Sequence, residues 1–345
     1  MKILGCMSGS SLDGLDMALC DFESDSTYSL IKANTVAYSD KWVARLQKVN
    51  DLSHEDSCLL EADFTTYIAA AILEFLDGEE TAYISSHGHT IVHNPDSGYS
   101  YQLANGAYLA AKTSIPVISE YRLQDIAKGG QGAPIAPAIE KYLLSGYDAY
   151  LNLGGIANIS HHSTKNIKAY DIGPCNQLLN ALAHQAGKQF DDGGSLAKTG
   201  ELINELMSSS LAHSYFSANP PKSLDNRFVV NEFVQPFLDH PGSVVNKLHT
   251  ATQLIAKTIT AESGQGNQIY ATGGGALNTF LMECLKQEFE KENNQLIIPE
   301  KEMVEFKEAI LMALMGYLRL HNKVNVFSSV TGATSDTVAG SIYAC

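Results

Sequence analysis

The stretch KILGCMSGSSLDGLDMALCDF, Lys2 to Phe22, decides the fold of this chain. Two apolar runs, residues 3–6 and 17–22, flank a turn rich in glycine and serine, so the stretch is expected to form a β-hairpin. Glycines in such a turn let backbone N–H groups approach an anion without an intervening Cβ. Its two middle serines are suited to donate to phosphate oxygens, and its aspartates to hold a hydrated Mg²⁺. An ordinary hairpin turn is the alternative, because the Gly-Lys-Ser/Thr ending of a Walker A loop is missing.

Composition limits the class of protein. A chain of 345 residues is long enough for about two domains, and 45% hydrophobic with 18% charged residues is typical of a soluble globular protein. The formal net charge of −15 argues against binding to nucleic acid or to an anionic membrane surface. The six cysteines form no C-x-x-C pair, which favours a reducing compartment without disulfides. With no signal-peptide core and no apolar run that would span a bilayer, we expect a cytoplasmic protein.

The pattern of the opening hairpin recurs in the middle of the chain. Residues 150–160, YLNLGGIANIS, again read as strand, glycine-bearing turn and strand. A third strand over 167–172 runs into Gly-Pro, and a helix is expected from about Gln177 to Gln185. Two similar hairpins, each opening a half that places strands before helices, predict a duplicated α/β architecture with a cleft between the halves.

A third glycine-rich turn lies further on. The strand predicted over 268–272 enters Gly273, Gly274 and Gly275, and a helix is predicted over 279–291. A triple glycine between a strand and a helix N-terminus lets the backbone approach a nucleotide, with N–H groups pointing outward. Following two phosphate-type hairpins, this turn is a candidate for the adenosine end of a nucleotide.

Asp171 is the candidate catalytic carboxylate. It stands at the end of the 167–172 strand, before a Gly-Pro turn, where a side chain is able to project into a cleft. A carboxylate there is suited to accept a proton. The alternative is that Asp171 caps backbone N–H groups of its own turn.

Three histidines follow the buried strand predicted over 81–86. His87, His89 and His93 share a face if the segment stays extended, which invites a metal site. No acidic or cysteine ligand stands nearby in the sequence, and Gly88 suggests a bend. We therefore favour a polar or hydrogen-bonding role and assign no metal ligands among the residues.

The rest of the chain supplies helices and a domain crossing. Helices are expected over about 41–76, from 103 to 111, over about 246–262 and over 305–320, and the region between 23 and 40 is read only as polar. The loop at 129–134, with three glycines and a proline, is the candidate crossing. Before it, Arg122 and Asp125 are suited either to bind substrate hydroxyls or to form a surface ion pair. The expected domains are 1–128 with 331–345, and 129–330.

Taken together, the motifs resemble the anhydro-N-acetylmuramic acid kinase family of the actin, hexokinase and Hsp70 superfamily. The segments that match, in the family's order over nearly the whole chain, are MSGSSLDGLD, SHGHT, YRLQDIAKGGQGAPIAP, NLGGIANIS, DIGPCN, FDDGGSLAKTG, PPKS, ATGGGALN, KEAILMAL and VTGAT. The whole set is far more specific than any one member.

The resemblance implies two actin-like (ribonuclease H-like) domains around a nucleotide cleft, with ATP and Mg²⁺ as cofactors. It implies that water is added at C1 of a 1,6-anhydro amino sugar while O6 is phosphorylated, giving N-acetylmuramic acid 6-phosphate in cell-wall recycling. It implies Asp171 as the base that activates water, and Arg122, Asn176 and Glu308 near the sugar. The ATP-binding residues implied are Gly9, Ser10, Ser11, Leu12, Asp13, Gly14, Leu15, Asp16, Gly154, Gly273, Gly274 and Gly275.

The chain also departs from the family pattern. His89, Cys175 and Asn180 stand where the family usually has Gln, Gly and Asp, and residues 223–227 differ from the usual Ser-Thr-Gly-Arg-Glu. These departures leave the identity of the sugar open. The alternative function is another actin-like sugar or acid kinase that phosphorylates a hydroxyl without ring opening; a nucleotide-dependent binding protein is disfavoured, because no peptide-binding domain is appended. The expected partners are the sugar and ATP, and a homodimer is kept open.

Overall fold

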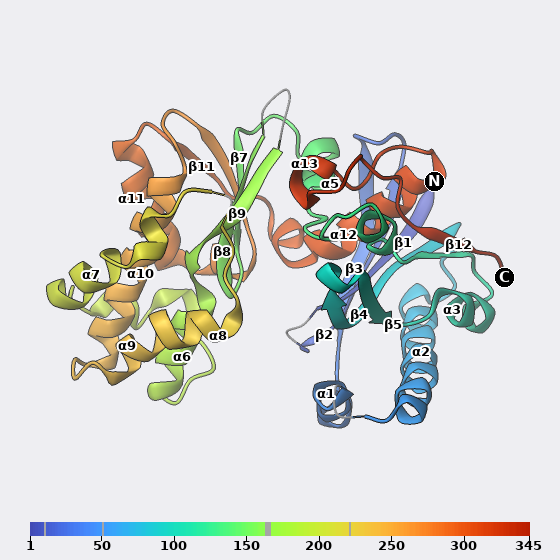
Figure 1. The fold of residues 1–345 in the computed structure, drawn as a ribbon, viewed down its shortest axis with the longest axis horizontal. Coiled ribbons are helices and arrows are strands. Elements are labelled where there is room, and N and C mark those ends of the chain that lie inside the picture. The colour runs from blue at the N-terminus through green and yellow to red at the C-terminus, as the bar shows by residue number, and fades with distance from the viewer. Residues whose placement is uncertain (10–11, 50–51, 163–166, 221) are drawn as a thin grey trace. The chain divides into compact units, whose positions relative to one another are not determined.

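The computed structural model describes the chain except residues 10–11, 50–51, 163–166 and 221, and it divides into two compact units. Unit 1 consists of Met1–Ser145 and Phe306–Cys345, and unit 2 of Gly146–Glu305. The blue-to-green and the red parts of the ribbon thus belong to one unit (Figure 1). These boundaries differ from the predicted ones, since 129–145 and 306–330 fall in unit 1. One reason is that Asp125 accepts a hydrogen bond from the Gly132 N–H and Ser85 donates one to the Met312 carbonyl oxygen, which keeps these segments on unit 1.

Unit 1 is built on a seven-stranded mixed sheet. Its strand order is β12-β6-β4-β1-β2-β3, and β5 pairs with β4. The strands are β1 Lys2–Ser8, β2 Gly14–Phe22, β3 Tyr28–Ala37, β4 Tyr83–Asn94, β5 Tyr99–Leu103, β6 Val117–Ser119 and β12 Ser341–Tyr343. The α-helices are α1 Asp40–Gln47, α2 His54–Leu76, α3 Gly106–Thr113, α4 Leu123–Ala127, α5 Pro137–Tyr142, α12 Lys301–Leu320, which begins in unit 2, and α13 Ser328–Thr331.

The opening hairpin is confirmed, and it forms the centre of this sheet. Strands β1 and β2 pair antiparallel from Lys2↔Asp21 to Ser8↔Leu15. Successive side chains of a strand point to opposite faces. Leu4 and Cys6 pack in a core cluster with α2 residues such as Phe64. On the other face Gly5 lies so close to α12 that a Cβ there would collide with the carbonyl oxygen of Ala309.

Unit 2 repeats the arrangement with five strands in the order β11-β10-β7-β8-β9. The strands are β7 Ala149–Leu153, β8 Ile156–His162, β9 Ile167–Pro174, β10 Gln268–Thr272 and β11 Gln295–Ile297. The α-helices are α6 Asn176–Gln185, α7 Asn204–Leu211, α8 Asn226–Val229, α9 Gln235–Asp239, α10 Val244–Glu262 and α11 Thr279–Lys291. Apolar residues of β7, β10, α6, α10 and α11 form one buried cluster.

The two sheets share one topology. In each, the first three strands form an antiparallel meander, and two further strands, β4 and β6 or β10 and β11, join the edge of the first strand in parallel. This confirms the predicted fold class, α/β with two actin-like (ribonuclease H-like) halves. Among the described residues, no helix combines the length and the apolar composition that crossing a bilayer requires.

Several elements differ from the expectation. The helix expected over 41–76 is two helices, α1 and α2, and α2 begins where Ser53 accepts a hydrogen bond from the Asp56 N–H as an N-cap. The polar region before α1 contains β3, whose residues are mostly exposed or half-buried. The helix expected from 103 starts at Gly106, after β5, with Asn105 as its N-cap.

Candidate functional site

In unit 1, the turn of the opening hairpin follows β1, which pairs in parallel with β4. Ser10 and Ser11 lie outside the described residues, so their predicted contacts with phosphate stay predictions. Next to them, the Ser8 hydroxyl accepts a 2.6 Å hydrogen bond from Tyr38 and lies 3.0 Å from Nδ1 of His89. Leu12 adopts a left-handed backbone conformation, with φ of 60°. The root of the turn is therefore fixed by buried polar contacts.

Gly14 has a packing role beside the proposed phosphate role. A Cβ at this position would lie 2.6 Å from the carbonyl oxygen of Val36 and 2.8 Å from Cγ2 of Thr35, both on the adjacent strand β3. The glycine is thus required for β2 and β3 to pair at this point. A substitution at Gly14 would perturb the sheet before it tested a phosphate contact.

Asp16 lies on β2 just after the turn and is half-buried. Its Oδ1 accepts a 2.5 Å hydrogen bond from the Thr35 hydroxyl. Burial raises the pKa of the Asp16 carboxyl, the Thr35 hydrogen bond opposes this, and the negative charges of Asp13 and Glu308 raise the pKa further. Three predicted site carboxylates are therefore close enough for their charges to act on Asp16.

The histidines and Arg122 form a second group in unit 1. Arg122 donates from Nε to Nε2 of His87 at 2.9 Å and from Nη1 to the carbonyl oxygen of Gly132 at 3.0 Å. Burial, the charge of Arg122 and the other histidines lower the pKa of His87 to about 3, so this ring is neutral. Glu308 also acts on Arg122, since its charge raises the arginine pKa against the effect of burial.

Each of the three histidines has a hydrogen-bonding role, as favoured from the sequence. His87 holds Arg122, His89 contacts Ser8, and Nδ1 of His93 lies 3.0 Å from the Ser100 hydroxyl. Gly88 has a φ of +74° within β4, and His87 and His89 are both buried. Within the described ranges, no group of three or more His, Cys, Asp or Glu side chains is placed to hold a metal ion.

Asp125 does not form the surface ion pair that was one of its two predicted roles. The side chain is fully buried, which excludes a surface ion pair. Its carboxylate accepts 2.8 Å and 2.7 Å hydrogen bonds from the Gly132 N–H and the Thr331 hydroxyl. It thereby fixes the glycine loop at 129–132, the loop whose carbonyl group positions Arg122.

In unit 2, the predicted glycine turns come together. β7 and β10 are parallel neighbours paired up to Asn152↔Thr272, so the turns at Gly154 and Gly273 both follow carboxyl ends of adjacent strands. Asn176 joins them: its Nδ2 donates to the Leu153 carbonyl oxygen at 2.9 Å and lies 3.6 Å from where a Cβ on Gly274 would stand. The structure thus places Asn176 among the predicted nucleotide glycines.

Asp171 lies on β9 and is half-buried. The predicted Gly-Pro turn is wrong, because Gly173 and Pro174 continue β9. The Asp171 Oδ2 accepts a 2.9 Å hydrogen bond from the N–H of Leu224, a residue far along the chain. The alternative of a local cap is therefore not what this side chain does. Burial raises the pKa of Asp171, and the Leu224 hydrogen bond partly opposes the rise. A raised pKa makes the carboxylate a stronger base.

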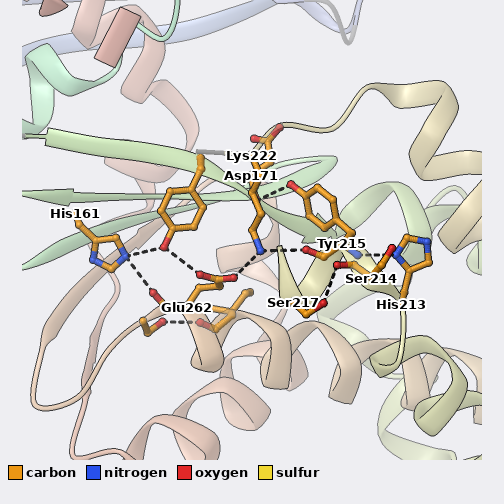
Figure 2. Close-up of polar contacts among 11 residues, drawn as sticks. His161, Asp171, His213, Ser214, Tyr215, Ser217, Lys222 and Glu262 are labelled. Carbon is orange, nitrogen blue, oxygen red and sulfur yellow. Dashed lines mark hydrogen bonds and ion pairs between the residues drawn. The ribbon is translucent and has the colours of Figure 1, made fainter. Parts of the chain in front are cut away.

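Sequence reasoning missed the residues around Asp171. Tyr215, Lys222 and Glu262 form a polar network beside it, which Figure 2 shows. The PPKS motif gave a signal for Lys222, but its partner lies on a different element, at the end of α10. Sequence spacing does not reveal a pair of this kind.

Comparison with known proteins places this chain. The family model described as anhydro-N-acetylmuramic acid kinase matches residues 1–345. Proteins named anhydro-N-acetylmuramic acid kinase from Nitrosomonas europaea and Sulfurovum sp. are 32% and 34% identical, each match covering 99% of both chains. One from Hahella chejuensis is 34% identical over 98% of this chain and 97% of the relative.

Solved structures show more distant likeness. An ADPNP-bound activator of 2-hydroxyisocaproyl-CoA dehydratase from Clostridium difficile is 12% identical, with a TM-score of 0.45 over 93% of this chain and 97% of that one. A ROK family glucokinase from Streptomyces griseus, in complex with glucose and AMPPNP, is 10% identical, with a TM-score of 0.45 over 91% and 98%. The full-length family match and the relatives together show that the chain belongs to the anhydro-N-acetylmuramic acid kinase family.

Proposed function

We propose that this protein is an ATP-dependent kinase that opens the 1,6-anhydro ring of anhydro-N-acetylmuramic acid and phosphorylates O6. The observation that carries the proposal is the family match over residues 1–345. In the reaction, a water oxygen bonds to C1, the C1–O6 bond breaks, and O6 forms the new bond to the γ-phosphorus as ADP leaves. The products are N-acetylmuramic acid 6-phosphate and ADP.

Asp171 is proposed as the base that takes the proton from the attacking water. Two features of its surroundings support this role. Burial raises its pKa, so its basicity exceeds that of an exposed aspartate. Its Oδ2 accepts from the Leu224 N–H, and within the described part of the chain no donor reaches Oδ1. One carboxylate oxygen is therefore oriented while the other has room to accept a proton.

Arg122 is proposed to bind the carboxylate that distinguishes muramic acid from other amino sugars. Its Nε and Nη1 are already engaged with His87 and the Gly132 carbonyl group, which fixes the plane of the guanidinium. A guanidinium held in this way recognises a carboxylate with little loss of side-chain entropy. Glu308, exposed and electrostatically coupled to Arg122, is proposed to contact sugar hydroxyls.

The nucleotide is proposed to bind at the glycine turns that the sequence predicts. The Gly9–Asp16 turn would face the phosphates, and the turns at Gly154 and Gly273–Gly275 the nucleoside. Asp16, whose pKa is raised by burial and by the charges of Asp13 and Glu308, is proposed to face a hydrated Mg²⁺ bound to the nucleotide phosphates. The bound ion would neutralise charge on the phosphates during transfer. Backbone N–H donors and side-chain acceptors of the chain would position ATP and the sugar.

The test is to incubate the protein with ATP, Mg²⁺ and the anhydro sugar and to weigh the product by mass spectrometry. Ring opening adds one water to the phosphorylated sugar, whereas phosphorylation of an intact anhydro ring does not. The ring-opened sugar serves as the competing substrate. We expect ATP consumption with the anhydro sugar and a product that contains the added water. A phosphorylated product that lacks it would identify a hydroxyl kinase instead.

A further inference from the structure

One segment, residues 213–224, makes hydrogen bonds to both the backbone and the side chain of Asp171. Residue 221 of this segment lies outside the described residues. The Asp171 N–H donates to the Lys222 carbonyl oxygen at 3.0 Å. The Asp171 carbonyl oxygen accepts from the Tyr215 hydroxyl at 2.8 Å, and Oδ2 accepts from the Leu224 N–H at 2.9 Å. The orientation of this carboxylate is therefore set by the 213–224 segment as well as by β9.

One ammonium group holds that segment in place. Nζ of Lys222 forms a 2.7 Å ion pair with Oε1 of Glu262, at the end of α10. It also donates to the Tyr215 carbonyl oxygen at 3.3 Å and lies 5.0 Å from the centre of the Tyr215 ring. The side chains of Lys222 and Glu262 are only 5% and 18% exposed, so water screens the pair weakly. In Figure 2 the ammonium lies between the Glu262 carboxylate and the Tyr215 carbonyl group.

Glu262 connects the same pair to the strand of Asp171. Its Oε2 accepts a 3.1 Å hydrogen bond from the hydroxyl of Tyr170, the neighbour of Asp171 on β9. Its backbone carbonyl oxygen lies 3.0 Å from Nε2 of His161 on β8. A carboxylate with one oxygen on Lys222 and the other on Tyr170 ties the segment and the strand to one point. Removing one member of such a buried pair leaves the other uncompensated.

We infer that Lys222 and Glu262 are a positioning pair for Asp171, which they hold through the 213–224 segment. Neither contacts the reacting atoms; they act through the three hydrogen bonds that the segment makes to Asp171. The inference rests on the proposed role of Asp171 as the base. It adds two residues of the chain to that role and predicts that a change remote from the substrate alters the protonation of Asp171.

The effect on Asp171 follows from the groups around it. The charged and titratable side chains that these contacts bring together are Lys222 and Tyr215 from the segment, Tyr170, His161 and Glu262. Burial raises the pKa of Asp171, and the Leu224 hydrogen bond lowers it. A loosened segment changes both the burial and this hydrogen bond, so the pKa of Asp171 changes. The acid limb of the kcat–pH profile then moves from its wild-type position.

The experiment measures kcat, KM and the pH profile of Lys222→Met with the anhydro sugar, together with its melting temperature. Because a misplacement of about 1 Å can cost about 10²-fold in rate, we expect kcat to fall between about 10- and 100-fold. The acid limb should move from its wild-type position, while KM for ATP stays within about twofold of the wild type. Lys222→Arg, which keeps a cation for Glu262, should recover most of the lost kcat.

A matched control lies on the same helix. Lys257→Met removes another ion pair of α10, with Glu288 at 3.3 Å, away from Asp171. It should leave kcat and the acid limb unchanged. In either variant, a loss of folded protein would lower the measured activity without moving the acid limb of the kcat–pH profile. The pH profile therefore separates an effect on positioning from an effect on stability.

The outcomes distinguish this inference from the proposed function. A folded Lys222→Met protein with the wild-type kcat and acid limb, in a chain that Asp171→Asn inactivates, overturns the positioning pair alone. Near-normal turnover in Asp171→Asn overturns the base and the inference with it. If Lys222→Met does not fold, Glu262→Gln takes its place, since it removes the negative charge that pairs with Lys222 and keeps the length of the side chain. A folded Glu262→Gln protein with the wild-type kcat and acid limb also overturns the inference.

Discussion

Nε of Arg122 donates a 2.9 Å hydrogen bond to Nε2 of His87. Because Nε2 accepts, the proton of the neutral ring is on Nδ1, which lies 3.1 Å from the Gly88 carbonyl oxygen and donates to it. Both ring nitrogens are thus used, and a second proton would face the arginine. Protonation of His87 is therefore expected to lower the stability of the folded protein.

The first prediction concerns stability below neutral pH. The folded state lowers the pKa of His87 to about 3, below the ordinary value of 6.5, so protonation favours the unfolded chain. The neutral His87 makes its full contribution to the free energy of unfolding above pH 6.5. This contribution is lost as pH falls from 6.5 towards 3. Between pH 7.5 and 5 we expect His87 to cost the wild type about 2 kcal/mol of unfolding free energy. Urea denaturation of the wild type and of His87→Gln, which has no ionisable group at this position, measures the difference in the pH dependence of the unfolding free energy.

The surface variant His184→Gln serves as its control, since His184 is exposed on α6. Equal pH dependence in the wild type and His87→Gln would contradict the neutral, buried state of His87.

The second prediction concerns Asp171→Asn. The amide keeps an oxygen for the Leu224 N–H but no longer accepts a proton, so the fold and ATP binding should persist. Loss of a positioned general base costs about 10²- to 10⁴-fold in rate, which should appear in kcat. In the wild type, the raised pKa of Asp171 should place the acid limb of kcat above the ordinary aspartate range, about 3.9. Turnover, melting temperature and ATP affinity are measured on one preparation, and a folded variant with near-normal turnover excludes the role.

The third prediction compares two adjacent glycines. A Cβ on Gly274 meets nothing closer than 3.6 Å, whereas Gly273 has a φ of +85° and a Cβ there would lie 2.8 Å from the Leu153 carbonyl carbon. Gly274→Ala should therefore keep the melting temperature but weaken ATP binding about tenfold, or about 1.4 kcal/mol. Gly273→Ala should lower the melting temperature. Calorimetric titration with ATP checks both, and unchanged affinity in Gly274→Ala would remove this turn from the nucleotide site.

The fourth prediction concerns Mg²⁺ and Asp16. Within the group Asp13, Asp16 and Glu308, neutralising Asp16 removes a charge that is proposed to face Mg²⁺ but also relieves repulsion. Asp16→Asn should therefore need about tenfold more Mg²⁺ for half-maximal turnover, about 1.4 kcal/mol, without a loss of thermal stability. Activity is titrated with Mg²⁺ after removal of metal by a chelator. Asp96→Asn, an exposed aspartate outside the group, is the control, and the same Mg²⁺ requirement in both variants would contradict the assignment.

The parts of the fold that the sequence predicted are those encoded locally. The hairpins of β1 with β2 and of β7 with β8, the strand β10 and the helix α11 each carry their own apolar period and turn residues. Strand β3 was missed because it is a half-exposed edge without a continuous apolar face. The break between α1 and α2 depends on the Ser53 cap, a single-residue signal within an otherwise helical pattern.

Residues of the candidate site could be predicted only where they belong to a recognisable sequence motif. Asp171 and the glycine turns were found in this way. The partners that set their chemistry could not be found, because they are far apart in the chain. Asp171 binds Leu224, Lys222 binds Glu262, and Arg122 binds His87. Asp125 looked like a surface residue beside Arg122, and only the packing of the glycine loop and α13 shows that it is buried.

The closure of unit 1 by residues 306–345 has a consequence for synthesis of the chain. The continuous unit 2 is complete once residue 305 has left the ribosome, although it starts later than unit 1. Until α12 emerges, the face of β1 that carries Gly5 has no covering helix, and Ser85 on β4 lacks its acceptor, the Met312 carbonyl group. Exposed sheet surface of this kind is what chaperones bind and what drives aggregation of nascent chains. The N-terminal half of this protein is thus made first and finished last.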